Sequence, residues 1–244
     1  MADPLNYAAP ALLDRNKHRR TRVRPGAGFA FARNTNSVYV AAAEFNEAAK
    51  EYAIVFTRSG TGGQPAPVLL LGMRDRENLF VAEGDRWDGR YIPAFVRRYP
   101  FVLAQAPQQQ LAVCIDEACP GLSESEGEAL FDGEGQETPY LKNTLSFLTD
   151  YQREYARTEA FCKRLDEAGL LTEMNARADL NDGSSYAVNG MLIVDEKKLL
   201  ALPDATVLSL FRTGELHLVS VHLASLTNMQ RLVDRMAQRP APAR

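Results

Sequence analysis

The chain has 244 residues, of which 45% are hydrophobic and 24% are charged, and its formal net charge is −3. This size and composition are typical of a soluble globular protein that buries a sizeable core as one large domain or two closely packed ones. No apolar stretch approaches the roughly eighteen residues needed to cross a bilayer, and three cysteines in so long a chain exclude a dense disulfide framework.

The first 24 residues form a basic arm. Six of the chain's 28 Lys and Arg residues and two of its 31 Asp and Glu residues lie there, which leaves 22 and 29 for residues 25–244. A basic run suits nucleic acid or an anionic membrane, but the acidic remainder argues against a nucleic-acid groove. We therefore predict no nucleic-acid partner and an arm that is solvated or lies on the acidic body. The acidic residues available to it are Glu124, Glu126, Glu128, Asp132, Glu134 and Glu137.

The arm also bears on localisation. It lacks the order of basic start, apolar run and small-residue cleavage site that marks a cleaved signal peptide. We expect a cytoplasmic protein and leave surface export by a non-cleaved signal open.

Residues 28–116 are rich in short strand patterns. Residues 29–32 and 37–41 lie on either side of an Asn-rich turn and are expected to pair as a hairpin. A short helix is expected at 43–50, and the other expected strands are 52–57, 68–72, 78–82, 101–104 and 111–116. This spacing favours a mostly antiparallel sheet. The glycine-rich loop at 59–64 lacks the P-loop ending and the following helix, so we expect no nucleotide site there.

We expect the chain to be organised around residues 87–101, WDGRYIPAFVRRYPF, which we call the hub. Asp88-Gly89 is a turn signal, Pro93 can open a short helix at 93–98, and Pro100 directs the chain into the strand that follows. The side chains expected to face inward are Ile92, Phe95 and Val96, and those expected to stay near the surface are Arg90, Arg97 and Arg98.

Two interpretations of the hub stay open. It is either a structural corner held by aromatic rings or a binding surface of the aromatic and arginine type found at interaction hot spots. The candidate binding residues are Trp87, Arg90, Tyr91, Arg97, Arg98 and Tyr99.

The pattern changes after Pro120. A short acidic helix is expected at 122–131, and a long one is expected from a Thr138 cap and Pro139 to a stop at Gly169. Two strands at 170–180 and 185–194 flank an Asn-Asp-Gly turn at 181–183. The remaining expected helices are 195–200, capped by Asp195, then 204–211 and 214–238.

These patterns predict an α+β protein with a mostly antiparallel N-terminal sheet and a helix-rich C-terminal half that contains a β-hairpin. We expect a basic N-terminal arm at 1–24, a single domain at 25–238 and a flexible tail at 239–244. A sub-boundary near 120–138 stays open.

No catalytic or metal-ligand pattern stands out. His217 and His222 are five residues apart, which is about 140° around a helix, so they do not face one metal. Residues 179–183 lack the alternating acids of a calcium loop. The adjacent acids Asp116/Glu117 and Asp195/Glu196 suit caps or solvent better than an acid–base pair. We predict no metal, no cofactor and no catalytic residue, and leave a bond between Cys114 and Cys119 open.

Three blocks of sequence, taken in order, resemble the SapC family of bacterial proteins. They are YIPAFVRRYPF, then YLKNTLSFLTDYQREYARTEAF followed by LDEAGLL, then VNGMLIVDEKKLLALPDATVLSLFRTGELHLVSVHLASLTNMQRL. The resemblance covers roughly residues 22–236. The family takes its name from a protein linked to a paracrystalline surface layer. Its members resemble proteins whose genes often lie beside genes for three other kinds of protein. These are outer-membrane receptors, flavin-dependent halogenase-like proteins and iron/2-oxoglutarate hydroxylases.

The resemblance implies no agreed catalytic residues. Our first hypothesis is a non-catalytic binding or accessory protein of the SapC type, linked to surface-layer or outer-membrane uptake systems. Its hub aromatics and arginines would engage another protein or a small anionic or sugar-like ligand. The alternative is an enzyme or small-ligand-binding protein with an unrecognised site that works with a halogenase-like or hydroxylase partner.

Overall fold

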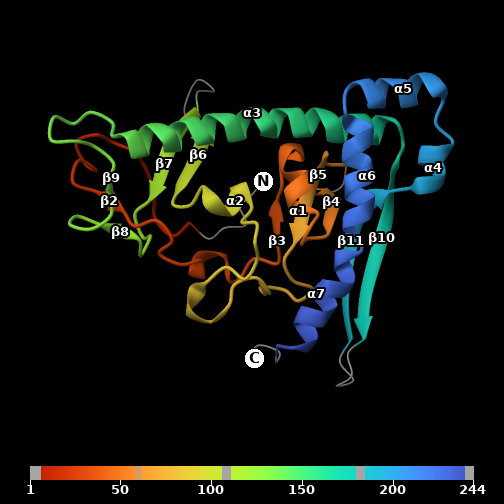
Figure 1. Cartoon of the computed structure of the whole chain (residues 1–244), viewed down its shortest axis with the longest axis horizontal. Coiled ribbons are helices and arrows are strands. Elements are labelled where there is room, and N and C mark those ends of the chain that lie inside the picture. Colours follow the sequence, from red (N-terminus) through yellow and green to blue (C-terminus); the bar gives the residue numbers. More distant parts are fainter. Residues whose placement is uncertain (1–6, 59, 61, 106–110, 180–184, 240–244) are drawn as a thin grey trace.

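The computed structural model describes residues 7–58, 60, 62–105, 111–179 and 185–239, and the strands within them form three antiparallel sheets. The largest has the order β10-β11-β4-β5-β3 and lies on the right of Figure 1. Its strands are β3 (Ser37–Tyr39), β4 (Ile54–Arg58), β5 (Pro65–Leu70), β10 (Leu171–Asp179) and β11 (Ser185–Val194). Because Leu192 of β11 pairs with Phe56 of β4, the predicted C-terminal hairpin extends the N-terminal sheet.

Two smaller sheets lie at the other end of the molecule (Figure 1). One has the order β1-β7-β6 and contains β1 (Pro10–Leu12), β7 (Leu111–Asp116) and β6 (Phe101–Gln105). The other has the order β8-β2-β9 and contains β8 (Leu122–Ser123), β2 (Arg22–Val23) and β9 (Glu128–Ala129). In both, a strand of the basic arm pairs with residues beyond position 110.

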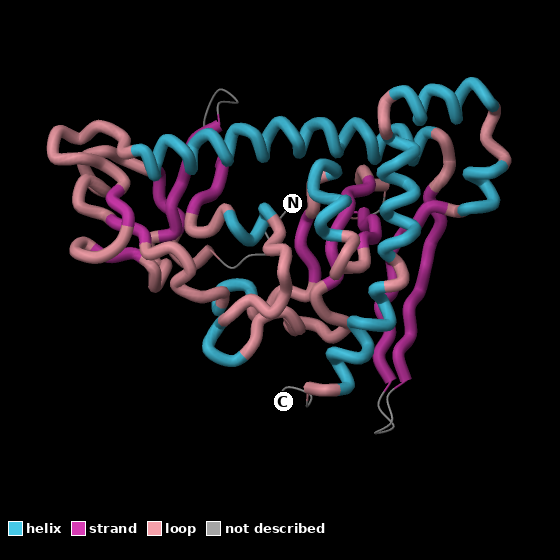
Figure 2. Tube along the Cα trace, in the orientation of Figure 1, coloured by secondary structure: helices cyan, strands magenta, loops and turns pink. Residues whose placement is uncertain are grey.

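The longer helices belong to the C-terminal half, and the predicted α+β class is confirmed. They are α3 (Pro139–Glu167), α4 (Glu196–Leu200), α5 (Asp204–Arg212), α6 (Glu215–Ser225) and α7 (Asn228–Ala237). The short turns α1 (Phe45–Ala48) and α2 (Ala94–Arg97) lie between strands, and Figure 2 shows long loops around α2. Within the described part of the chain, no helix is both long and apolar enough to cross a membrane.

Helix α3 joins the two ends of the molecule. Thr138 caps it by accepting a hydrogen bond from the Leu141 amide at 3.3 Å, as predicted, and Pro139 opens it. Its 29 residues reach roughly 44 Å, and Figure 1 shows it running along one whole side of the protein. Leu141 and Leu148 pack in a cluster with Phe101 and Ile115, whereas the later residues of α3 pack on the main core.

Two predicted strands are wrong. Residues 29–32 form a 3₁₀ turn at Ala30–Ala32, because the Phe29 amide donates to the Asp85 carbonyl at 2.7 Å and β3 pairs with β5 instead. Residues 78–82 contain a turn at Leu79-Phe80 and one isolated bridge between Val81 and Trp87. The Asn78 side chain accepts from the Phe80 amide at 2.8 Å and donates to the Ala32 carbonyl at 3.0 Å. Such local bonds compete with a strand ladder.

The predicted acidic helix at 122–131 is also wrong. Residues 122–129 form strands β8 and β9, which hold β2 of the arm between them. The intervening turn requires glycine at position 127, where φ is +100° and an added Cβ would lie 2.4 Å from the Val23 carbonyl oxygen. Residues 122–131 resemble a helix when they are considered alone. In the folded chain they pair with β2 of the arm as strands.

The basic arm lies on the acidic body. Arg20 pairs with Glu124 at 3.1 Å and Arg24 with Glu126 at 3.7 Å, so this part of the prediction is confirmed. Lys17 and the buried His18 both contact Glu117. Arg22 instead donates to the Gly127 carbonyl at 2.9 Å. These ion pairs are largely exposed, so the backbone pairing of β1 and β2 contributes more to holding the arm.

The last predicted helix, 214–238, divides into α6 and α7. Ser225 donates to the His222 carbonyl at 2.6 Å and accepts from the Ile54 amide at 3.0 Å. Asn228 donates to the Ala49 and Tyr52 carbonyls at 2.7 and 3.1 Å. These side chains satisfy backbone groups at the end of α1 and at the start of β4, on either side of the break between α6 and α7.

His222 has a related role in the core. Its Nε2 accepts from the Val194 amide at 3.1 Å, and its Nδ1 donates to the Ile54 carbonyl at 2.9 Å. The ring therefore bridges β11 and β4 in its neutral form. Burial lowers the pKa of His222 from 6.5 to about 4.

This lowered pKa predicts a loss of stability in mild acid. Between pH 6.5 and pH 4 the unfolded chain binds a proton at His222 and the folded chain does not, so the stabilisation is complete above pH 6.5 and falls as the pH falls. We expect the free energy of unfolding to decrease by about 3 kcal/mol between pH 7 and pH 4 from this residue.

Urea unfolding across that range would measure the effect, with His222→Gln as the comparison. The variant is less stable at pH 7 but should show a flatter dependence on pH. Parallel curves for the two proteins would contradict the assignment.

Some predicted features lie outside the described residues. They are the turn at 181–183, positions 59 and 61 of the glycine-rich loop, and residues 240–244 of the tail. Arg239, at the start of that tail, donates to the Asn78 and Val81 carbonyls.

Cys114, Cys119 and Cys162 are free thiols, so the disulfide left open by the sequence is not formed.

Candidate functional site

The hub follows the predicted path of turn, helix and strand. A turn at Asp88-Gly89 leads through an extended segment to α2, and after Pro100 the chain enters β6. Trp87, Phe95 and Phe101 are buried, so these three rings belong to the core, whereas Tyr91 and Tyr99 are only partly buried. Trp87 is only 6% exposed, and its indole Nε1 donates to the Tyr52 hydroxyl at 3.0 Å and to the Tyr91 carbonyl at 3.2 Å.

One carboxylate fixes the middle of the hub. Glu44, which is 8% exposed, accepts from the Ala41 amide at 3.0 Å with one oxygen. With the other oxygen it accepts from the Tyr91 hydroxyl at 2.6 Å and the Ala94 amide at 2.7 Å. This residue was not predicted. A capping box is recognised by Ser or Thr three positions before the acid, and position 41 is alanine.

A second carboxylate holds the turn. Both oxygens of Glu51 accept from the Arg90 amide, at 2.8 and 3.0 Å. A Cβ at position 89 would lie 2.7 Å from the Tyr52 hydroxyl and 3.0 Å from a Glu51 oxygen, so only glycine allows this close approach. The loop from Trp87 to Tyr91 is therefore clamped against the segment that follows α1.

Burial raises the pKa of Tyr52 and of Tyr91, and the charge of Glu44 adds to the effect at Tyr91. Both phenols therefore stay protonated at neutral pH. They act as hydrogen-bond donors that position the hub loop.

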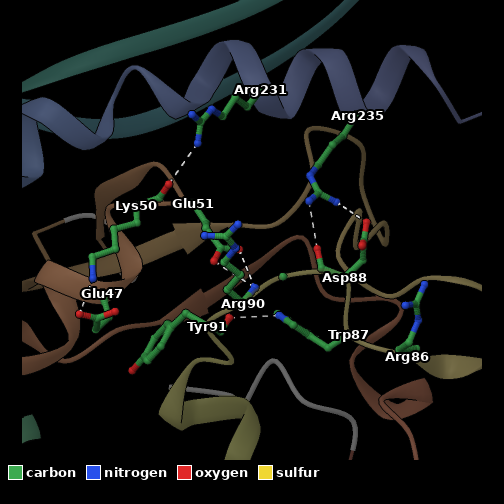
Figure 3. A pocket seen from close by; sticks show the side chains of 11 residues that line it. Glu47, Lys50, Glu51, Arg86, Trp87, Asp88, Arg90, Tyr91, Arg231 and Arg235 are labelled. Carbon is green, nitrogen blue, oxygen red and sulfur yellow. Dashed lines mark hydrogen bonds and ion pairs between the residues drawn. The ribbon is translucent and has the colours of Figure 1, made fainter.

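This loop forms one wall of an open groove of about 940 Å³, which we call the hub groove (Figure 3). The opposite wall is α7, from which Arg231 and Arg235 extend toward the hub (Figure 3). The lining residues are Glu47, Lys50, Glu51, Arg86, Trp87, Asp88, Gly89, Arg90, Tyr91, Arg231 and Arg235. Five of them are cations and three are carboxylates, so the lining has a net charge of +2 in a chain whose net charge is −3.

The carboxylates of the groove already have partners. Glu47 pairs with Lys50 at 2.6 Å, Asp88 pairs with Arg235 at 2.7 Å, and Glu51 accepts from the hub backbone. The guanidinium groups of Arg86 and Arg90, by contrast, make no ion pair or hydrogen bond with another residue that the structure describes. Free guanidinium groups suit planar anions such as carboxylate and phosphate, which they can bind with two hydrogen bonds.

The other three candidate residues do not line the hub groove. Arg98 is 8% exposed, with its guanidinium 4.0 Å from the Phe95 ring centre and 5.5 Å from that of Tyr151, so the expectation that it stays near the surface is wrong. Packing between α2 and α3 covers it. Arg97 is exposed and donates to the Ile92 carbonyl at 2.9 Å. Tyr99 stacks on Phe31 with ring centres 3.8 Å apart.

The fold and the groove define an α+β protein with antiparallel sheets and a polar surface site. A sequence model of the SapC family matches residues 13–232, which is most of the chain. The protein belongs to the SapC family. No curated protein matches the chain, and no solved structure does.

Proposed function

We propose that the chain is a non-catalytic binding protein whose hub groove takes a small anionic, sugar-like ligand. The observation that carries this proposal is the pair Arg86 and Arg90, whose guanidinium groups have no partner among the described residues, in a groove with two more cations than carboxylates. An excess of positive charge in an otherwise acidic chain attracts an anion by long-range steering as well as by contact.

The character of the groove supports the sugar-like part of the proposal. Its lining is mostly charged, and the indole N–H of Trp87 is already committed to Tyr52 and Tyr91. A ligand with many hydroxyl groups replaces water at such a surface better than an apolar one does. Its volume of about 940 Å³ lies near the upper end of the range of small-molecule sites.

We further propose that the protein is an accessory component of surface-layer or outer-membrane uptake systems. Membership of the SapC family supports this part, and the cationic hub groove is compatible with it. The proposal requires no reaction in the groove.

Titration calorimetry with glucose 6-phosphate, with glucose and inorganic phosphate as separate probes, would test the groove. We expect glucose 6-phosphate to bind more tightly than either fragment, and binding to weaken as salt is raised. Changing Arg86→Gln and Arg90→Gln together should lower the affinity about tenfold or more, because each charge-assisted hydrogen bond contributes over 1 kcal/mol. The melting temperature should change by only a few degrees, since neither guanidinium group is bonded to another residue in the part of the chain that the structure describes.

The matched control is Arg76→Gln with Arg212→Gln. Both of these arginines are exposed and lie outside the groove, and the net charge change is the same. Equal affinity in the two double variants, or no binding of glucose 6-phosphate by the native chain, would contradict the proposal.

A further inference from the structure

A second cavity borders the other part of the hub. Residues 86–91 line the hub groove, whereas hub residues between 92 and 100 line a separate pocket of about 400 Å³. The remaining walls come from residues 23–31, from residues 119–121 and from α3. We call it the aromatic pocket because its side chains include Phe29, Phe31, Tyr99 and Tyr140, together with Ile92 and Val96.

The aromatic walls are held in place from behind. The Phe31 and Tyr99 rings are stacked with an interplanar angle of 14°, and Phe29 meets Trp87 edge-on at 5.5 Å. The Tyr99 hydroxyl donates to buried Asp116 at 3.2 Å, and that carboxylate also accepts from the Ala9 amide at 2.8 Å. The pocket is therefore formed before any ligand enters, which lowers the entropy cost of binding.

The charges at the aromatic pocket have one sign. Among its lining residues the charged side chains are Arg24 and Arg97, and no carboxylate accompanies them. Arg24 donates to the Pro120 carbonyl and is 3.7 Å from Glu126. In the part of the chain that the structure describes, Arg97 pairs with no carboxylate. Its Nε donates to the Ile92 carbonyl, and its guanidinium lies 5.4 Å from the Phe147 ring centre.

We propose that the aromatic pocket binds a small aryl carboxylate. The aryl ring packs between the aromatic walls, which offer both stacked and edge-on contacts, and the carboxylate faces Arg97. An anion is favoured because both charged lining residues are cations, and a ring is favoured over an alkyl chain because four aromatic side chains line the pocket. This ligand differs in chemistry from the polar one proposed for the hub groove, and the inference does not depend on that proposal.

Calorimetry with 3-phenylpropionate would test the inference, with 3-phenylpropionamide, 3-phenylpropylamine and octanoate as comparison probes. We expect the acid to bind about tenfold more tightly than the amide, which has the same body without the charge. The amine should bind more weakly still. Equal binding of acid and amide would overturn the anionic part of the proposal, and tighter binding of octanoate would overturn the aromatic part.

Two variants locate the site. Arg97→Gln should remove the preference for the acid over the amide, whereas Arg212→Gln, at an exposed position away from the pocket, should preserve it. Ala30→Trp places a large ring at an exposed lining position and should abolish binding of both probes, with Ala205→Trp on α5 as its control.

If Ala30→Trp fails to fold, the test rests on Arg97→Gln alone. The measured quantity is then the ratio of the affinities of that variant for the acid and for the amide. Binding of 3-phenylpropionate that survives both pocket changes, or no binding at all, would overturn the proposal. The Arg86→Gln and Arg90→Gln double variant should bind 3-phenylpropionate normally, which separates the two cavities.

Discussion

Replacing Trp87 by alanine is expected to lower the free energy of unfolding by about 3–5 kcal/mol, a large part of the roughly 5–15 kcal/mol typical of a folded domain. The indole stacks on Phe80 with ring centres 6.1 Å apart and packs against Phe29. Its removal leaves a cavity between these rings. It also removes the donor that connects Tyr52 with the Tyr91 carbonyl.

Urea unfolding followed by far-ultraviolet circular dichroism is the suitable measurement, because Trp87 is the only tryptophan and its fluorescence disappears in the variant. Trp87→Phe keeps an aromatic ring and should cost less than the alanine variant. Arg90→Gln, three residues away and exposed, should be nearly neutral. A Trp87→Ala protein within 1 kcal/mol of the native one would show that the hub is not part of the core.

Replacing Glu44 by alanine is expected to cost about 3 kcal/mol or more. The Ala41 amide, the Tyr91 hydroxyl and the Ala94 amide would lose their acceptor at a buried position, and each unsatisfied donor costs about 1–3 kcal/mol. The hub would also lose its attachment to the segment before α1. Chemical denaturation of the purified variant measures this cost.

The control for this variant is Glu47→Ala, one helical turn further along. Glu47 is exposed and pairs only with Lys50 among the described residues, so its loss should cost less than about 0.5 kcal/mol. Glu44→Gln keeps one acceptor oxygen and should fall between the two. Similar stabilities for Glu44→Ala and Glu47→Ala would disprove the anchoring role of Glu44.

The sequence predicted best those elements whose limits depend on neighbouring residues. Thr138 and Pro139 mark the start of α3 and Gly169 follows its end, because capping groups act within one helical turn. Asp195 caps α4 in the same way by accepting from the Lys197 and Lys198 amides. The hub helix and the strand after it follow from the fixed geometry of Pro93 and Pro100.

Elements that depend on distant partners were missed. Residues 122–131 look helical until β2 of the arm is placed between β8 and β9. The hydrogen bonds of Ser225 to Ile54 and of Asn228 to Tyr52, on either side of the break after α6, are also not shown by any apolar periodicity.

The candidate site was also predicted only where its residues are close in sequence. Trp87, Arg90 and Tyr91 share a groove because they are close in sequence, but Arg231 and Arg235 reach it only through the packing of α7. Their spacing of four residues predicts that the two arginines lie on one face of a helix. It does not predict which other element that face contacts. The burial of Arg98 likewise depends on α3.

The pairing of the arm also determines the order in which the chain can fold. Pro10 pairs with Asp116, and Val23 pairs with Leu122 and Glu128, so about a hundred residues separate each arm strand from its partners. During synthesis the arm leaves the ribosome long before those partners exist. Closing so long a loop costs chain entropy that only the completed pairs offset, which makes such contacts slow to form. Residues 10–12 and 22–23, which are synthesised well before their partners, are therefore among the last to reach their final positions.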